Sequence, residues 1–180
     1  MKALKWMALV CVLFAASAWG QGVAVGNASV GKSIFSPDKS MSISIPKGWV
    51  EDRELHDTAD LQASNRAEEC YIIVLTDSKD DFEDMTLVKH SETTRKSLLS
   101  SLTAPEVLGP TKMTIDGKPA LQYEIRGSID NLKVTYLHTT VETPKHFQQI
   151  LTWTLRSRFD KNKPILQQVA TSFREVRAEK

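Results

Sequence analysis

Four histidines are the first side chains to consider for chemistry, because imidazole serves both as a metal ligand and as a general base near neutral pH. His138 is the most informative of them. The strand register worked out below places it on an apolar sheet face beside Tyr123 and Gln149. Such a cluster is either a polar pocket with a perturbed imidazole or a core group that orders three side chains. We expect the core arrangement.

The other three histidines have weaker contexts. His56 lies in a loop beside three carboxylates, those of Glu54, Asp57 and Asp60. Such a loop could bind a divalent metal, but no second His or Cys stands at ligand spacing, so a solvated loop is expected. His90 and Glu92 are two apart on a predicted helix and face different ways. His146 lies at a predicted turn, and no cofactor is expected.

Nucleophiles are equally isolated. Cys70 follows two glutamates, whose charge disfavours a thiolate, so it is expected to be a small apolar strand residue. No serine lies in a G-x-S-x-G context, and no glycine-rich phosphate loop is present. The sequence therefore contains no recognisable catalytic set, and we expect a protein that is not an enzyme.

The first twenty residues predict a secretory signal peptide. Lys2 and Lys5 precede an apolar run over residues 6–16, and small residues follow, with cleavage expected after Ala18 or Gly20. A membrane-spanning helix needs about 20 apolar residues, and this run is shorter. We therefore expect a periplasmic or secreted protein with no stable membrane span after cleavage.

The charge of the mature chain excludes two classes of partner. Loss of residues 1–20 removes two lysines, which leaves 21 Lys and Arg against 22 Asp and Glu and a net charge of −1. A nucleic-acid-binding protein needs a concentrated basic face. Attachment to an anionic membrane surface needs the same. Neither kind of partner is expected.

The remaining chain is predicted to hold a flexible lead-in at 21–33 and one domain at 34–176. Apolar alternation, turn dipeptides and prolines define its elements. Strands are predicted at 41–45, 61–64, 70–75, 111–115, 119–126, 133–141 and 147–156. One helix is predicted at 85–102, and a second begins between Asp160 and Pro164. One face of the first helix is predicted to carry Val88, Ser91, Arg95, Leu98, Leu99 and Leu102. This apolar stripe is modest, so the first half of the helix is expected to be partly exposed.

Two turns set a register for the last three strands. Centring the turn at Asp130-Asn131 pairs Tyr123 with His138, and centring the next at Thr143-Pro144 pairs Tyr136 with Leu151. One sheet face is then apolar, with Leu121, Tyr123, Ile125, Val134, Tyr136, Phe147, Leu151, Trp153 and Leu155. A slip of one residue would mix the two faces, so this segregation supports the assignment.

The opposite sheet face is predicted to be hydrophilic. It carries Gln122, Glu124, Arg126, Thr135, Thr139, Gln148, Thr152, Thr154 and Arg156. Such a face can simply meet water. If a helix leaves part of it open, six of these side chains could hold a ligand or a partner: Gln122, Glu124, Arg126, Thr152, Thr154 and Arg156.

The order of elements resembles the PsbP-like superfamily over about residues 34–176. An N-terminal β segment runs from Phe35 through Ile43-Ser44-Ile45-Pro46 to Gly48-Trp49, followed by a long helix, an antiparallel meander and a helix closing on Ser172-Phe173. That superfamily includes an extrinsic subunit of photosystem II, a nuclear-transport accessory factor and bacterial periplasmic proteins of the DcrB type.

The resemblance implies an α+β fold of the α/β/α sandwich type, with a central antiparallel sheet flanked by helices. It also implies a non-catalytic accessory or binding role, but it transfers no functional residue, because one fold hosts many activities. The matching positions are structural: Ile43, Ile45, Pro46, Trp49 and Phe173.

The leading hypothesis is therefore an exported, non-catalytic accessory or binding module of the bacterial cell envelope. Its partner would be an envelope protein or a small ligand. One alternative is a small periplasmic hydrolase that uses His138 and a neighbouring carboxylate. The other is a metal-responsive envelope protein that uses His56 and its acidic neighbours.

Overall fold

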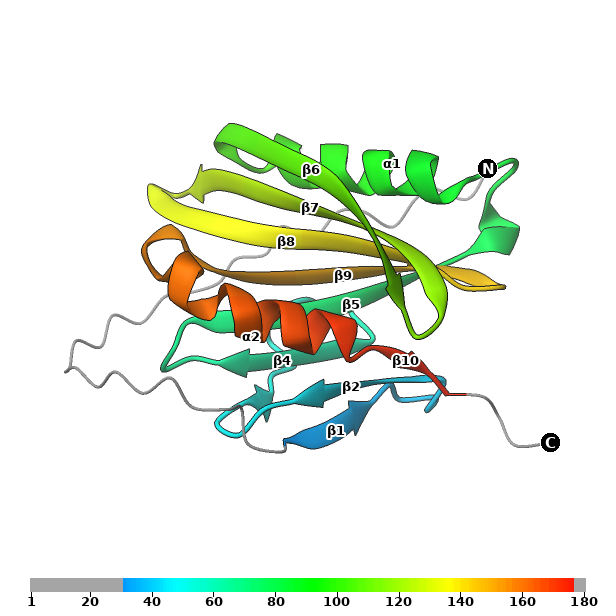
Figure 1. Cartoon of the computed structure of the whole chain (residues 1–180), viewed down its shortest axis with the longest axis horizontal. Coiled ribbons are helices and arrows are strands. Elements are labelled where there is room, and N and C mark those ends of the chain that lie inside the picture. The colour runs from blue at the N-terminus through cyan, green and yellow to red at the C-terminus, as the bar shows by residue number, and fades with distance from the viewer. Residues whose placement is uncertain (1–30, 177–180) are drawn as a thin grey trace.

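A seven-stranded antiparallel sheet forms the centre of the domain in a computed structural model that describes residues 31–176 (Figure 1). Its spatial order is β3-β4-β5-β9-β8-β7-β6. The strands are β3 (Val50–Glu51), β4 (Leu61–Asn65), β5 (Cys70–Ser78), β6 (Thr103–Ile115), β7 (Lys118–Ile129), β8 (Leu132–Glu142) and β9 (His146–Leu155). The predicted signal peptide and positions 21–30 of the predicted lead-in lie outside the described residues.

Two further layers cover the sheet. A three-stranded sheet, β1-β2-β10, is built from β1 (Lys32–Phe35), β2 (Met41–Ile45) and β10 (Arg174–Glu175). The helices are α1 (Leu87–Ser100) and α2 (Phe159–Thr171), with short 3-10 turns η1 (Lys79–Asp81) and η2 (Arg156–Arg158). The α+β fold expected from the sequence is confirmed: helices flank a central antiparallel sheet.

Two apolar clusters show which layer covers which face of the large sheet. One joins Leu166 and Val169 of α2 and Ile43 of β2 to Ile72 and Ile150 of the large sheet. The other brings side chains at the end of α1, such as Leu98, Leu99 and Leu102, onto aromatic sheet residues that include Tyr136 and Trp153. The sheet is therefore buried on both faces, with α1 on one and α2 with the small sheet on the other.

The predicted register is confirmed at β7–β8 and wrong by two residues at β8–β9. Tyr123 faces His138, but Tyr136 faces Trp153 and not Leu151. The reason is that the β8–β9 turn centres one residue later than predicted, with Pro144 in the second turn position, where proline is favoured. A two-residue shift keeps every side chain on its face, so the apolar face is correctly assigned.

The prediction of a hydrophilic opposite face is wrong for most of its residues. Gln122, Thr135, Thr139, Gln148, Thr152 and Thr154 are all buried there. The same face also carries Leu137, Val141 and Ile150, which alternate with the threonines along the strands and belong to the core under α2. Threonine is common in buried strands as well as in solvent-exposed ones. The polarity of these threonines therefore did not show that α2 and the small sheet cover this face.

Helix α1 begins at Leu87 after Thr86, whose side chain accepts a hydrogen bond from the Lys89 N–H. Its first half is partly exposed, as expected, and of the predicted stripe only Ser91 is buried there. Val88 is 52% exposed, and the buried residues there are His90, Ser91 and Thr94. The helix therefore places polar side chains, and not an apolar stripe, on the sheet along its N-terminal half.

Strand β6 is longer than predicted and forms one edge of the large sheet. It starts at Thr103, and its pairing with β7 is irregular around Pro105 and around Pro110. Prolines lack the N–H that a central strand needs, so they are tolerated at edges and bulges. Helix α1 ends at Ser100, before Pro105, and the chain enters the sheet at Thr103, so Pro105 lies within β6.

Candidate functional site

A cluster of buried polar groups that includes two histidines lies between the N-terminal half of α1 and the large sheet. We call it the polar layer and define it by His90, Ser91 and Thr94 of α1 and His138, Thr140 and Gln149 of β8 and β9. All six are buried, among them both histidines. Charged side chains such as those of lysine and glutamate are rarely buried without a partner. The same holds for a histidine when its imidazole is charged.

His138 is fully enclosed, with an exposed fraction of 0%. Its Nε2 lies 3.0 Å from Thr94 Oγ1, and the edge of its ring meets that of Tyr123 with centroids 6.3 Å apart. The pKa of His138 is lowered from 6.5 to about 3, mainly by burial, with smaller contributions in the same direction from the nearby His90 and Arg95. The imidazole is therefore neutral at physiological pH and cannot be reached from solvent without movement of α1.

The predicted trio is only partly assembled. The structure brings Tyr123 beside His138, but Gln149 faces Thr140 because of the shifted β8–β9 register. The guanidinium of Arg95 lies over the Tyr123 ring, 4.6 Å from its centroid. No carboxylate hydrogen-bonds to His138 within residues 31–176, so the geometry does not support the hydrolase alternative.

His90 is the residue that the sequence analysis missed. Its Nε2 lies 2.8 Å from Asp77 Oδ2 at the end of β5, and its ring stacks on Phe147 at a centroid distance of 4.5 Å. From the sequence, only Glu92, two residues further along the helix, was considered as a partner for His90. The sequence did contain a hint of this contact, because His90 follows an acidic segment that begins at the end of β5. However, only the fold shows that Asp77 of that segment is the residue that meets His90.

Five buried atoms of the polar layer have no hydrogen-bond partner among the described residues. They are His90 Nδ1, Ser91 Oγ, His138 Nδ1, Thr140 Oγ1 and Gln149 Oε1. A buried polar group left unsatisfied costs about 1–3 kcal/mol. Five such groups would together cost roughly as much as the whole stability of a typical domain, about 5–15 kcal/mol.

The loop histidine does not form a metal site. His56 Nδ1 accepts a hydrogen bond from the Thr58 N–H at 3.2 Å, and Gln62 holds the His56 backbone through two bonds of 2.7 and 2.8 Å. Across positions 31 to 176, no three or more His, Cys, Asp or Glu side chains are grouped so that they could hold a metal ion. The metal-responsive alternative gains no support from this arrangement.

The six residues proposed as a polar binding surface do not form one. Gln122 is buried and donates to Thr139 Oγ1 at 2.9 Å, and Thr154 is buried and accepts from Asn162 of α2 at 3.2 Å. Thr152 is also buried. The prediction is corrected for these three, because they are buried on the sheet face that α2 and the small sheet cover.

The three charged members of that set are half-buried and ion-paired. Glu124 contacts both Arg126 at 2.6 Å and Lys163 of α2 at 2.9 Å, while Arg156 lies 3.6 Å from Glu106. Burial alone would raise the pKa of Glu124, but its bonds to Lys163 and Arg126 lower it below the usual value. These side chains fix α2 and β6 to the sheet.

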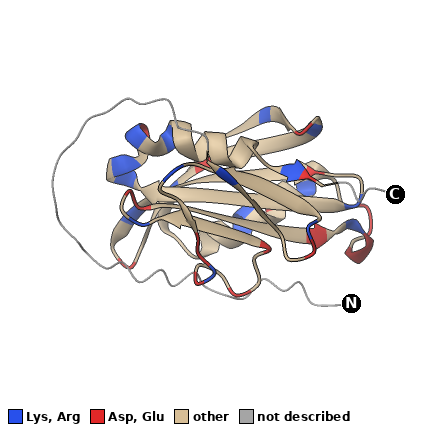
Figure 2. Ribbon diagram, turned by 90° about the horizontal axis from the view of Figure 1, so that it is seen from below, with Lys and Arg blue, Asp and Glu red and all other residues tan. Residues whose placement is uncertain are grey.

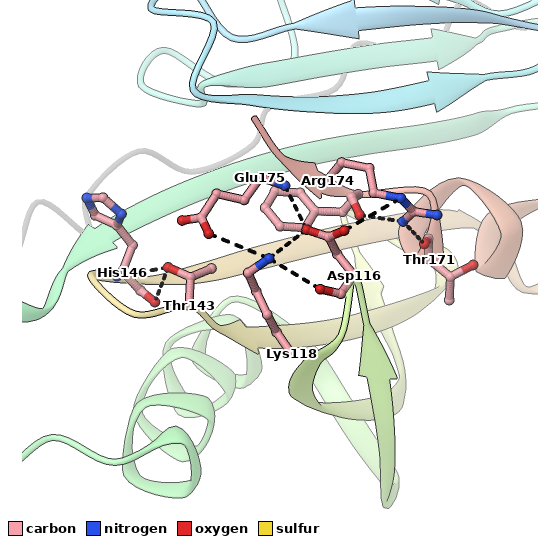
Figure 3. Close-up of polar contacts among 8 residues, drawn as sticks. Asp116, Lys118, Thr143, His146, Thr171, Arg174 and Glu175 are labelled. Atoms are coloured by element: carbon pink, nitrogen blue, oxygen red, sulfur yellow. Dashed lines mark hydrogen bonds and ion pairs between the residues drawn. The ribbon is translucent and has the colours of Figure 1, made fainter. Parts of the chain in front are cut away.

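A second polar cluster fastens the C-terminal strand to the β6–β7 turn (Figure 3). Lys118 Nζ lies 2.6 Å from Asp116 Oδ2 and 3.5 Å from Glu175, and the Glu175 N–H donates to Asp116 Oδ2 at 3.1 Å. Arg174 lies 3.8 Å from Asp116 Oδ1. Burial would raise the pKa of Asp116, but the Lys118 and Glu175 bonds lower it, so the carboxylate stays ionised and holds β10.

Charge is spread over the domain. Figure 2 shows Lys and Arg together with Asp and Glu at both ends of the ribbon. Within residues 31–176 no helix is both long enough and apolar enough to cross a membrane. The mixture of both signs of charge agrees with the near-neutral charge balance of the sequence.

No protein-family model and no curated protein sequence matches the chain. Solved structures do. The cyanobacterial PsbP protein (CyanoP) of Synechocystis has 17% identity and a TM-score of 0.61, over 87% of this chain and 98% of that one. LpqN of Mycobacterium tuberculosis, described as involved in cell envelope biogenesis, has 13% identity and a TM-score of 0.59, over 79% and 88%.

The Ran-binding protein Mog1p of Saccharomyces cerevisiae is a third match, with 16% identity and a TM-score of 0.56 over 82% of this chain and 97% of that one. Identities this low carry the fold and no residue roles. The chain has a PsbP-like fold, as the resemblance implied, while the likeness to DcrB-type proteins stays a prediction.

Proposed function

We propose that this chain is an exported, non-catalytic accessory or binding module of the bacterial cell envelope, which acts by contacting an envelope protein or a small ligand. The observation that carries the proposal is the fold. Among proteins that share it, Mog1p is described as Ran-binding and LpqN as involved in cell envelope biogenesis. Fold alone does not assign a function, so the side chains must be considered beside it.

The chemistry-bearing side chains support a binding role. His138 is sealed and neutral, and the Cys70 thiol is buried, with its pKa raised by burial to about 12. Catalysis by a nucleophile and a general base needs both groups within reach of a substrate. Over the described part of the chain, neither His138 nor Cys70 meets that condition.

Export is tested by the N-terminus of the protein isolated from cells. Cleavage after Ala18 would leave Trp19 as the first residue, and cleavage after Gly20 would leave Gln21. Mass spectrometry of the protein from a periplasmic or secreted fraction should find one of these two ends. An intact chain that begins at Met1 and stays in the cytoplasm would contradict the export part of the proposal.

Binding is tested by capture from an envelope fraction with the C-terminally tagged chain as bait. A tagged PsbP-like protein of similar fold, such as CyanoP, is the matched control bait, because it removes proteins that adhere to the fold in general. We expect a partner enriched by this chain and not by the control, which then binds the purified protein in solution. Recovery of the bait alone, with no enriched protein and no ligand bound to it, would count against the proposal.

A further inference from the structure

We propose that the N-terminal half of α1, residues 87–95, is a flap that lifts from the large sheet while the rest of the domain stays folded, and that acid favours the lifted form. Such a flap goes beyond the proposed binding role, and it is independent of which partner the protein contacts. The observations behind it concern how the flap is attached to the sheet, compared with the attachment of α2 and of the rest of α1.

Polar groups attach the flap to the sheet. Thr94 Oγ1 lies 3.0 Å from His138 Nε2, and His90 Nε2 lies 2.8 Å from Asp77 Oδ2. His90 also stacks on Phe147, with ring centroids 4.5 Å apart. The flap is therefore held by side-chain hydrogen bonds and stacked rings, and not by an apolar stripe.

The aliphatic side chains of the flap contribute little to this attachment. They are Leu87 and Val88, and neither belongs to either apolar cluster of the domain; Val88 is 52% exposed. Farther along α1, Leu98 and Leu99 pack against the cluster that contains Tyr136. The hydrophobic effect thus anchors the C-terminal half of α1 but not the flap.

Helix α2 is attached in the opposite way. Its residues Leu166, Val169 and Ala170 are each 0% exposed and belong to the core cluster that also contains Ile72 and Ile150. Lifting α2 would expose this apolar surface to water, at a cost in free energy that grows with its area. Lifting the flap exposes mainly polar groups, which water solvates, so the flap should open more readily than α2.

Several atoms at this interface gain hydrogen-bond partners when the flap lifts. Among the described residues no partner is found for four buried atoms, which are His90 Nδ1, Ser91 Oγ, Arg95 Nε and His138 Nδ1. Water reaches them only in the lifted form, so each unpaired group shifts the opening equilibrium toward that form by a factor of about ten. The closed flap is therefore less stable than a fully paired interface would be.

Acid acts on the same equilibrium through His138, which the flap covers. The ring faces His90 and Arg95 of α1 and Tyr123 of β7, and its neighbour on β9, Leu151, is apolar. Its pKa is about 3 when covered and returns toward 6.5 when the flap lifts. Below pH 6.5 the lifted form holds a proton that the closed form lacks, so the opening constant should rise about 25-fold between about pH 7 and pH 5.

Thiol labelling tests the flap directly. Ser91→Cys places a thiol on the buried side of the flap, and Ala170→Cys places one on the buried side of α2 as the matched control, because both positions are 0% exposed. The native Cys70, which is buried in the same cluster as Ala170, is a second reference inside each protein. A dithiodipyridine labels thiols in acid as well as at neutral pH, and each rate is divided by that of the same thiol in the urea-unfolded variant.

At neutral pH the thiol introduced at position 91 should react about tenfold faster or more than the thiol at position 170 and Cys70. Its rate should also depend only weakly on low concentrations of urea, because lifting the flap exposes little surface. Equal rates at all three thiols, rising with urea as steeply as global unfolding does, would overturn the proposal.

The acid dependence has its own control. The normalised rate at position 91 should rise about 25-fold from about pH 7 to pH 5, and adding His138→Gln to Ser91→Cys should remove most of that rise. A rate that does not rise, or a rise that His138→Gln leaves unchanged, would overturn the part of the proposal that concerns acid.

Hydrogen exchange of the wild-type chain, followed by NMR, makes the comparison without any substitution. After correction for intrinsic rates, amides of residues 91–95 should exchange about tenfold faster or more than those of residues 166–170 in α2. Equal protection of the two helices would overturn the proposal even if Ser91→Cys failed to fold.

Discussion

Acid should destabilise this domain, and one buried side chain, His138, should carry a separable part of that effect. Its pKa in the folded protein is about 3, against 6.5 when unperturbed, because the fully buried ring has no water to solvate a charge. The folded state therefore stays neutral while the unfolded state takes up a proton. The stabilisation is complete above about pH 6.5 and is lost progressively as the pH falls from there toward 3.

The size of the effect follows from the shift. One pKa unit corresponds to about 1.4 kcal/mol, so the free energy of unfolding should fall by about 3 kcal/mol between neutral pH and about pH 4 from His138 alone. The full loss, reached near pH 3, is about 5 kcal/mol. Domains of this kind are stable by about 5–15 kcal/mol, so the loss is large.

Urea denaturation at a series of pH values measures this loss in the free energy of unfolding. His138→Gln keeps an amide that can donate to Thr94 and removes the titration, so its free energy of unfolding should fall less steeply with acid than that of the wild type. The difference between the two proteins should change by about 3 kcal/mol between neutral pH and about pH 4. Carboxylates contribute equally to both and cancel.

His146→Gln is the matched control, since it removes a histidine from the β8–β9 turn and leaves the polar layer intact. It should follow the wild-type acid profile. Parallel profiles for the wild type and His138→Gln would refute the reasoning, because they would mean that the unfolded state gains no proton that the folded state lacks at this position.

Three further predictions concern other buried groups. Asp52 accepts hydrogen bonds from Arg66 at 2.9 and 3.0 Å, which together with Ser64 lower its pKa against the effect of burial; Asp52→Asn should therefore cost about 1–3 kcal/mol in urea denaturation at neutral pH and less in acid, and an unchanged midpoint would contradict this. Cys70, with its pKa raised by burial to about 12, should resist iodoacetamide in the folded protein and react once urea unfolds it, as mass spectrometry would show. A Cβ at Gly127 would lie 3.0–3.3 Å from Leu102, so Gly127→Ala should cost about 1–3 kcal/mol by overpacking and lower the melting temperature; an unchanged melting temperature would contradict this.

The meander was predictable because its signals are local. Alternation of polar and apolar residues fixes which way Tyr123, Ile125 and Tyr136 point, and the Asp116-Gly117 and Asp130-Asn131 dipeptides fix two of its turns. Both turns use positive φ at Asp116, Asp130 and Asn131, a conformation that these residues tolerate well. The fold class followed from these elements.

The site was less predictable because its contacts are distant along the chain. Asp77 and His90 meet only after β5 and α1 have packed, and the register of β8 against β9 decides whether Gln149 faces His138 or Thr140. The covering of the threonine-rich face depends on β1, β2 and α2 arriving together, an event that strand alternation in Thr152 or Thr154 does not encode.

The shape of strand β6 affects whether molecules of this protein can associate through their sheet edges. It forms an outer border of the sheet, and such borders can recruit strands from other molecules when they are long and flat. Here Pro105 and Pro110 withhold two N–H groups, and the irregular pairing with β7 at both prolines bends the border out of register. This edge is thus a poor template for fibril growth even though β6 spans thirteen residues.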